Sequence, residues 1–447
     1  MLAAMPPTPA PSSDQGESPI RDRGDACPGA LRLHRADDGL LARLRLPGGL
    51  LTGRQVAVLG AAAERLADGN LSITSRGNVE LRGLGDACGG ELSALLADAG
   101  LLPSERHERV RNVLASPLAG TDGLGRADVQ LWTRELDGLL CAEQWTTALS
   151  GRFLFVLDDG RGDVAGLGGD VTLIAESGGT VVVGVGDLAF RVAGADAPRA
   201  ALAGAGAFLA AAADAGNGAW RVGELPVGQA IDLAGALEGA GVGAVRVGPG
   251  AVGSGGSAGP GAVGSGGSAG PGAVGPGGPP PPGVIGRAVS VHAPLGRVSV
   301  GQWRALLPLP ADELRVTPWR GFVLPGFADE GSARERLGSL AEAGYLTDPG
   351  SPWLGVGACT GRPGCAKSLA DVRADAVPGH GSLPVHWSGC ARRCGHPHGD
   401  WIDVLATGDG DYEVTLHAGG STVPVTGGTL TEAVTTARTT TKPTATR

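Results

Sequence analysis

Four cysteines in the last quarter of the chain are spaced as ligands of a metal centre. Cys359 and Cys365 enclose five residues in ACTGRPGC, and Cys390 and Cys394 enclose three in SGCARRC. Four thiolates suit a [4Fe–4S] cluster, because each iron corner of the cuboid takes one soft ligand. Structural zinc is the alternative, but zinc sites favour roughly two to four residues between paired ligands. The spacing therefore favours an iron–sulfur cluster.

The residues around these cysteines fit that interpretation. Gly361, Pro363 and Gly364 supply the turns with which a loop wraps a cluster. Three histidines flank the second pair, and imidazole is also a ligand of non-haem iron. A polar loop explains any one of them equally well. These histidines are His386, His396 and His398.

The composition is that of an ordinary globular protein. Hydrophobic residues make up 42% and charged residues 18% of the 447, and the net charge of −9 argues against a general nucleic-acid binder. No apolar run reaches the roughly 18 residues of a membrane span. Residues 1–26 lack the basic start and apolar stretch of a signal peptide. We therefore expect a cytoplasmic protein with a disordered leader at 1–26, in which cysteines serve metal or redox chemistry rather than disulfides.

A low-complexity tract divides the chain into two halves. Residues 246–284 contain repeats of GPGAVGSGGSA, a composition that buries no apolar surface and predicts a flexible linker. The Thr-rich end, 431–447, is expected to be a disordered tail.

The two halves resemble each other in sequence. ARLRLPGGLLTGRQVAVL leads to LSITSRGNVELRGL in the first half, and SVHAPLGRVSVGQWRALL leads to LRVTPWRGFVLPGF in the second. Val56, Leu59 and Ala63 recur at helical spacing, whereas Val79 and Leu81 alternate as in a half-buried strand. A repeated strand–helix–strand–helix unit predicts an α+β protein with pseudo-twofold symmetry. The matching positions are Pro47 with Pro294, Gln55 with Gln302, Thr74 with Thr317, and Gly83 with Gly326.

In spacing, order and duplication, these features resemble the sulfite and nitrite reductase superfamily, in which the two cysteine motifs hold a [4Fe–4S] cluster coupled to sirohaem. The resemblance implies duplicated reductase-like halves, each with a ferredoxin-like and a larger α+β domain. The expected parts are ferredoxin-like half-domain 1 at 27–100, reductase-like α+β domain 1 at 101–245, ferredoxin-like half-domain 2 at 285–350, and the 4Fe–4S-binding α+β domain 2 at 351–430.

Within the superfamily, three stretches resemble the precorrin-3B synthase branch: GDACPGALRLH, LRVTPWRGFVLPGF and SGCARRCGHP. That resemblance implies a monooxygenase of cobalamin synthesis, which hydroxylates the tetrapyrrole precorrin-3A with molecular oxygen and closes a lactone. It also implies a possible additional non-haem iron. The alternatives are a sirohaem-dependent sulfite or nitrite reductase, and a non-enzymatic 4Fe–4S electron-transfer protein.

Two departures from the reductases favour the synthase. The reductases carry an Asn within the last cysteine motif, where this chain has Ala391, Arg392 and Arg393. They also bind sulfite with paired lysines, and the corresponding positions here are Arg152 and Leu154. Losing one cation weakens a site for a small dianion.

Arginines are expected to bind the ring, because early corrinoid precursors and sirohaem are edged with carboxylates and Arg binds carboxylate through a planar fork. By resemblance, Arg76, Arg111 and Arg320 face the tetrapyrrole. Weaker candidates are Arg152, Lys367 and Arg392.

No strand followed by GxGxxG is present in the sequence. Electrons are therefore expected from an external donor or an NADH-linked reductase rather than from a built-in nucleotide domain. Neither nucleic acid nor membrane is an expected partner.

Overall fold

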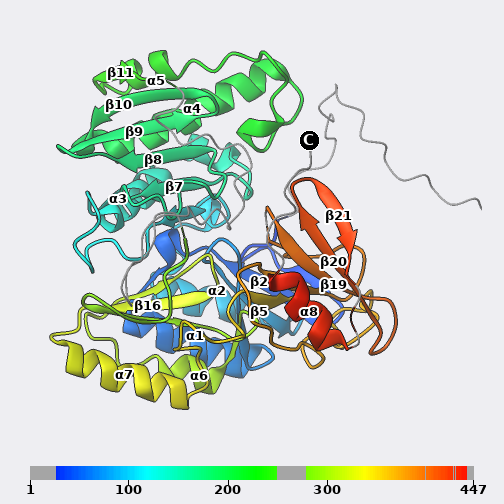
Figure 1. Cartoon of the computed structure of the whole chain (residues 1–447). Helices are drawn as coiled ribbons and strands as arrows, with labels where there is room; N and C mark the ends of the chain where they lie inside the picture. The colour runs from blue at the N-terminus through cyan, green and yellow to red at the C-terminus, as the bar shows by residue number, and fades with distance from the viewer. Residues whose placement is uncertain (1–26, 249–277, 398, 426, 428, 440–447) are drawn as a thin grey trace, which may run out of the picture.

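A computed structural model describes residues 27–248, 278–397, 399–425, 427 and 429–439 (Figure 1). Within these residues the chain forms four sheets, and the α+β class is as expected. Short 3-10 helices lie at Pro47–Gly49, Glu105–His107, Gln144–Ala148, Gly194–Asp196 and Val222–Glu224.

The two ferredoxin-like halves each contain a five-stranded sheet and two helices. The first sheet has the order β1 (His34–Ala36), β2 (Gly39–Leu44), β5 (Val79–Leu84), β4 (Asn70–Ile73) and β14 (Arg297–Ser299), with α1 (Gly53–Leu66) and α2 (Gly89–Asp98). The second has the order β12 (Gly283–Ile285), β13 (Ala288–His292), β16 (Gly321–Pro325), β15 (Leu314–Val316) and β3 (Leu50–Leu51), with α6 (Val300–Ala305) and α7 (Glu330–Glu342).

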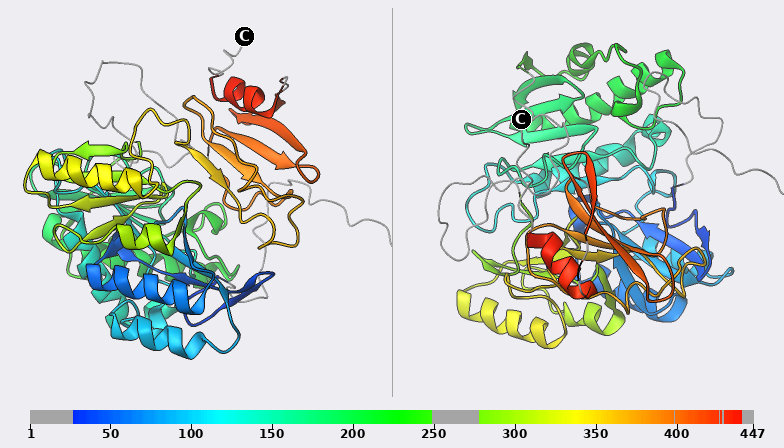
Figure 2. Two further views of the ribbon diagram at one scale, coloured as in Figure 1. Left: turned by 90° about the horizontal axis from the view of Figure 1, so that it is seen from below. Right: turned by 45° about the vertical axis from the view of Figure 1, so that its right-hand side comes forward.

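Each half contributes a short strand to the sheet of the other. Strand β14 of the second half pairs with β4 of the first, and β3 of the first pairs with β15 of the second. The halves share one apolar core and lie side by side in both views of Figure 2. This reciprocal exchange makes the pseudo-twofold unit inseparable, because neither sheet is complete without the other half.

Matching capping boxes start the helices that follow the exchanged strands. The Thr52 and Ser299 hydroxyls each accept a hydrogen bond from the backbone N–H of the glutamine three residues later, Gln55 or Gln302. The side-chain oxygen of that glutamine in turn accepts a hydrogen bond from the backbone N–H of the threonine or serine. Such boxes fix where a helix begins. The predicted helix positions Val56, Leu59 and Ala63 are fully buried.

The two larger domains repeat one strand pattern. Domain 1 has three parallel strands, β6 (Val113–Ala115), β7 (Phe155–Asp158) and β8 (Val171–Ala175), followed by antiparallel β9 (Thr180–Val185), β10 (Leu188–Ala193) and β11 (Ala244–Arg246). Domain 2 has parallel β17 (Val356–Ala358), β18 (Val385–Ser388) and β19 (Trp401–Ala406), followed by antiparallel β20 (Tyr412–Ala418) and β21 (Ser421–Pro424). Their helices are α3 (Val129–Ala142), α4 (Ala197–Ala215) and α5 (Leu233–Gly239) in domain 1, and α8 (Leu430–Thr439) in domain 2.

The C-terminal prediction was partly wrong. Helix α8 occupies most of the segment expected to be a disordered tail, because Val434 and Ala437 are buried against sheet β17–β21. Arg438 is also buried and donates to several backbone carbonyls, including those of Gly379 and Gly381. The expected leader, most of the linker and the end of the tail lie outside the described residues.

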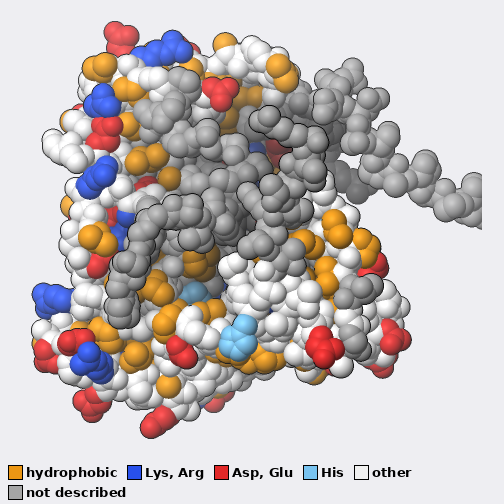
Figure 3. Space-filling model, in the orientation of Figure 1, with side chains coloured by type: hydrophobic (Ala, Val, Ile, Leu, Met, Phe, Trp, Pro, Cys, Tyr) orange, Lys and Arg blue, Asp and Glu red, His pale blue; other side chains and the backbone are white. Residues whose placement is uncertain are grey.

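Charged side chains of both signs are interspersed on the face shown in Figure 3. In the part of the chain described, no helix is long and apolar enough to cross a membrane.

Trp303 tests the shared core. It is fully buried on α6, and its indole N–H donates to the Val56 carbonyl of α1 at 2.7 Å. We expect Trp303→Ala to lower the free energy of unfolding by about 3–5 kcal/mol, measured by urea denaturation. Trp145→Ala is the control, because Trp145 is 38% exposed. Equal losses in both variants would contradict the shared core.

Candidate iron–sulfur centre

The first and third of the predicted cluster cysteines lie at the ends of two neighbouring parallel strands. Cys359 directly follows β17, and Cys390 lies two residues after β18. The Cys359 amide donates to the Trp387 carbonyl at 2.9 Å, and the Gly389 amide donates to Cys359 Sγ at 3.2 Å. A side chain at Gly389 is excluded, since its Cβ would lie 1.9 Å from Ser368 Oγ. The fold therefore places the first and third cysteines at one sheet edge.

Burial and backbone N–H groups act in opposite directions on the thiol of Cys359. Burial raises its pKa, while backbone N–H groups of Gly389 and Gly361 act in the opposite direction. The Cys394 thiol is close enough to add to the rise. Bound iron would supply the positive charge that favours these thiolates.

His386 holds the loop between the second pair of cysteines. Its side chain is fully buried on β18, and Nε2 lies 3.0 Å from the Cys394 carbonyl. Burial lowers its pKa to about 3, and the charge of Arg320 adds to this effect. The neutral ring donates from Nε2 to the carbonyl, so His386 positions the loop. His396 stacks on Trp401, and His398 lies outside the described residues.

Arg76 lies in a group of arginines that are buried or half-buried. Burial, together with the charges of Arg221 and Arg43, lowers its pKa to about 10. Among the described residues its guanidinium has no hydrogen-bond or ion-pair partner, so it is free to meet an anionic ligand. Asp170, the nearby acid, is already bound by Arg221 at 2.6 Å.

Arg45 belongs to the same group and was missed by the sequence interpretation. It is 4% exposed, donates to the Arg109 and Gly151 carbonyls, and leaves Nη1 without a partner. Burial lowers its pKa to about 10. The sequence feature that could have indicated a buried arginine is the position of Arg45 between Leu44 and Leu46, directly after a strand.

Arg111 already has an acidic partner inside domain 1. Its guanidinium forms a bidentate ion pair with Asp137, both bonds being 2.6 Å, and donates to the Leu101 carbonyl. This buried pair contributes to the fold of domain 1, and the expected contact of Arg111 with the ring stays a prediction.

The other predicted cations are spread around the centre. Arg320 is half-buried and donates to the Gly395 carbonyl at 3.0 Å, next to Cys394. Arg152 is half-exposed beside Trp220 and Glu224. Lys367 and Arg392 are exposed on the two cysteine loops. The structure thus brings Arg320, Lys367 and Arg392 to the cysteines.

The position at which a reductase was expected to carry a sulfite-binding cation is buried and apolar in this protein. Leu154 is 2% exposed and forms a small cluster with Leu114, Val156 and Val164, against which Trp319 packs. A sulfite ion would gain no charge-assisted hydrogen bond there.

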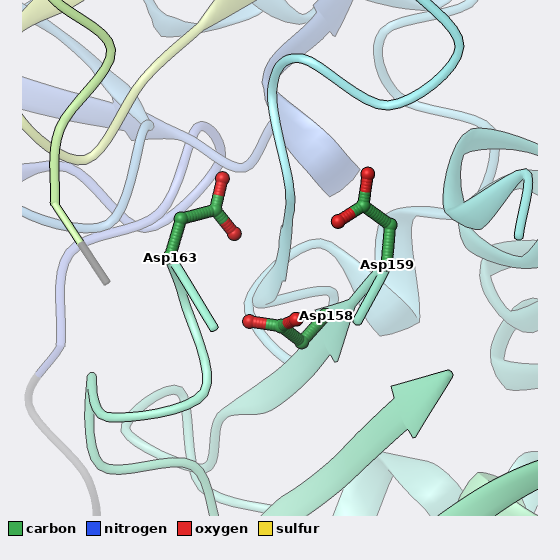
Figure 4. Close-up of side chains that lie close together, drawn as sticks. All are labelled: Asp158, Asp159 and Asp163. Carbon is green, nitrogen blue, oxygen red and sulfur yellow. The ribbon is translucent and has the colours of Figure 1, made fainter. Parts of the chain in front are cut away.

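Domain 1 carries a counterpart of the cysteine site without cysteines. Ser116 follows β6 as Cys359 follows β17; its amide donates to the Leu157 carbonyl, and its hydroxyl accepts the Asp159 amide at 3.0 Å. These bonds repeat those that Cys359 makes. Three carboxylates converge beside this serine, from the end of β7 and the following loop, and they belong to Asp158, Asp159 and Asp163 (Figure 4).

The protein itself occupies most of the oxygens in this acidic group. Asp158 accepts four backbone N–H groups at 2.8–3.1 Å, and Asp159 is paired with Arg161. Asp163 accepts from the Ser116 hydroxyl at 2.6 Å, which leaves its Oδ2 without a hydrogen-bond donor. The donor set thus fits a proton on Asp163 better than a metal ion.

Comparisons with known proteins agree with this fold. Residues 32–99 match the family model described as "Nitrite/Sulfite reductase ferredoxin-like half domain". The structure of the Mycobacterium tuberculosis NirA protein is similar with a TM-score of 0.59 and 20% identity, over 85% of this chain and 74% of that chain. The protein therefore has the fold of the nitrite and sulfite reductases.

Two kinds of curated relative share part of the sequence. A precorrin-3B synthase from Sinorhizobium sp is 34% identical over 149 residues, covering 33% of this chain and 31% of that protein. Ferredoxin–nitrite reductases from Leptolyngbya laminosa and Synechococcus elongatus are each 33% identical, over 22% and 27% of this chain and 20% and 25% of theirs. The matched stretches thus span less than a third of each relative. They confirm the resemblance to this superfamily, including precorrin-3B synthase.

Asp163 predicts a pH dependence of stability. Burial, with the charge of Asp158, raises its pKa from 3.8 to about 8, so the folded protein binds this proton more tightly than the unfolded chain. This stabilisation is complete below pH 3.8 and is lost as the pH rises to about 8. We expect wild-type stability to fall relative to Asp163→Asn by about 1.4 kcal/mol per pH unit between about pH 5 and 7.

Urea unfolding at several pH values measures this effect. Asp86→Asn, at an acid whose side chain is 77% exposed, should follow the wild type. Parallel stability curves for the wild type and Asp163→Asn would show that Asp163 is not protonated in the folded state.

Proposed function

We propose that this protein is a precorrin-3B synthase, which hydroxylates precorrin-3A with molecular oxygen and closes a lactone. The main support is similarity to the Sinorhizobium synthase, combined with a buried, uncharged Leu154 at a position where a sulfite reductase is expected to carry a cation. One oxygen atom would enter the product and the other would leave as water. The two electrons required would come from an external donor or an NADH-linked reductase.

The cysteine quartet would hold a [4Fe–4S] cluster. The donor set fits, because Cys359 and Cys390 end adjacent strands and backbone N–H groups are directed at the first sulfur. The cluster supplies one-electron transfer when bound. The protein's own residues position it: Gly389 permits the close approach of the loops, and His386 fixes the Cys394 carbonyl.

The carboxylate edge of the ring would lie against Arg76 and Arg45, with Arg152 as a peripheral contact. Both guanidiniums retain N–H groups that can donate to an acceptor. The ring carboxylates would accept these hydrogen bonds and compensate the positive charge of the two arginines, which burial disfavours. Trp319, which is partly buried and packs against the Leu154 cluster, would contact the apolar part of the ring.

A sirohaem-dependent nitrite or sulfite reductase is the second candidate, favoured by the nitrite reductase relatives. An assay with precorrin-3A, labelled oxygen gas and a reductant separates the two. The synthase incorporates one labelled atom into the ring. Nitrite or sulfite reduction by a sirohaem-containing protein, with no labelled ring product, would establish the reductase.

Cysteine substitutions test the cluster. Replacing Cys359, Cys365, Cys390 or Cys394 with Ser should remove most iron and acid-labile sulfide from anaerobically purified protein, because each variant lacks one cluster ligand. Cys88→Ser and Cys141→Ser are controls and should retain both. One bound zinc without sulfide in the wild type would contradict the cluster.

Arg76→Ala tests the ring site. We expect ring affinity to fall by about 1–3 kcal/mol through the loss of a charge-assisted contact, with the cluster retained. Arg111→Ala should instead lower the free energy of unfolding by about 3–5 kcal/mol, because it leaves Asp137 unpaired. Equilibrium ring binding and urea unfolding measure the two effects. Unchanged ring affinity in Arg76→Ala would contradict the assignment.

A further inference from the structure

Arg320 occupies a backbone position better suited to glycine. The hairpin between β15 and β16 repeats that between β4 and β5: the Thr317 and Thr74 amides each donate to the carbonyl four residues on. Arg320 and the matching Gly77 both have φ of 63°. This left-handed conformation is unfavourable for a residue with a Cβ. The second half therefore keeps an arginine at a strained position where the first half has glycine.

Two glycines clear a path for the Arg320 side chain. A Cβ at Gly296 would lie 2.3 Å from Arg320 Cδ, and one at Gly357 would lie 1.9 Å from Nη1. These glycines belong to different segments, one before β14 and one within β17. The path ends at the Gly395 carbonyl, directly after Cys394.

Trp319 and Arg320 extend toward different domains. The indole packs on the apolar cluster of domain 1 that contains Leu154, while the next residue reaches the cysteine loop of domain 2. The hairpin of half-domain 2 thus contacts both larger domains, and Arg320 is its contact with the candidate iron–sulfur centre.

The charge of Arg320 is not compensated nearby. Among the described residues it has no carboxylate partner, and the groups beside it are Arg373 and the neutral His386. Arg373 also lies close to Cys359 and donates to the Ala358 carbonyl. The guanidinium of Arg320, which has no counterion nearby, would therefore stabilise negative charge added at the cysteines.

We propose that Arg320 is a positioning residue of the iron–sulfur centre, which holds the Cys390–Cys394 loop and makes the cluster easier to reduce. The inference rests on the proposed cluster. Reduction adds one electron to the cluster, and the nearby guanidinium stabilises that added negative charge. The glycine path and the unfavourable backbone conformation are accounted for by this role.

Potentiometric titration of the holoprotein, followed by EPR, tests the proposal. Arg320→Gly should fold, since glycine is the residue at the matching turn, and its reduced-to-oxidised ratio at a fixed potential should fall about tenfold, equivalent to about 59 mV for one electron. Arg320→Lys, which keeps the charge, should remain closer to the wild type. Arg304→Ala removes an exposed cation paired with Glu64 and should not change the potential.

Hydrogen exchange of the metal-free proteins supplies a second measurement. Arg320→Gly should exchange faster than the wild type in residues 390–397, because the bond to Gly395 is lost. Equal potentials in wild type and Arg320→Gly, or unchanged exchange in a variant that loses its cluster, would overturn the role of Arg320. Absence of iron and sulfide from the wild type would instead overturn the proposed cluster.

Discussion

The exchange of β3 and β14 between the ferredoxin-like halves is the constraint on which the rest of the molecule depends. It makes one core from two repeats and brings their hairpins together: a Cβ at Gly77 would lie 2.9 Å from the Val316 carbonyl oxygen. Arg76 extends from one hairpin, and Trp319 and Arg320 extend from the other. The symmetric unit therefore presents different side chains to the two larger domains.

The larger domains show how one topology can hold two kinds of site. At equivalent strand ends, Cys359 accepts the N–H of Gly389 and Ser116 accepts that of Asp159. In domain 2 this geometry surrounds thiols, whereas in domain 1 it surrounds carboxylates that mostly have hydrogen-bond or ion-pair partners within the protein. The backbone supplies the position, and the side chain determines whether a soft metal centre fits there.

The sequence predicted the features that depend on local pattern, including the buried face of α1 and the repeated halves. It did not reveal the strand exchange, because a two-residue strand such as Leu50–Leu51 has no periodicity. The ion pair of Arg111 could not be predicted, because its partner, Asp137, lies 26 residues away in the sequence. Arg45 was overlooked because its surroundings become apparent only when the domains pack together. The ligand roles of the cysteines, Arg76, Arg111 and Arg320 stay predictions.

The most direct measurement is the EPR spectrum of the reduced, anaerobic protein before and after addition of precorrin-3A. If Cys394 and the arginine group form one site, the wild type should show a [4Fe–4S] signal whose g values change when the ring binds. Arg76→Ala should require more ring to reach the same change. A cluster signal that stays identical at saturating precorrin-3A, or a protein with no cluster signal, would contradict a shared cluster and tetrapyrrole site.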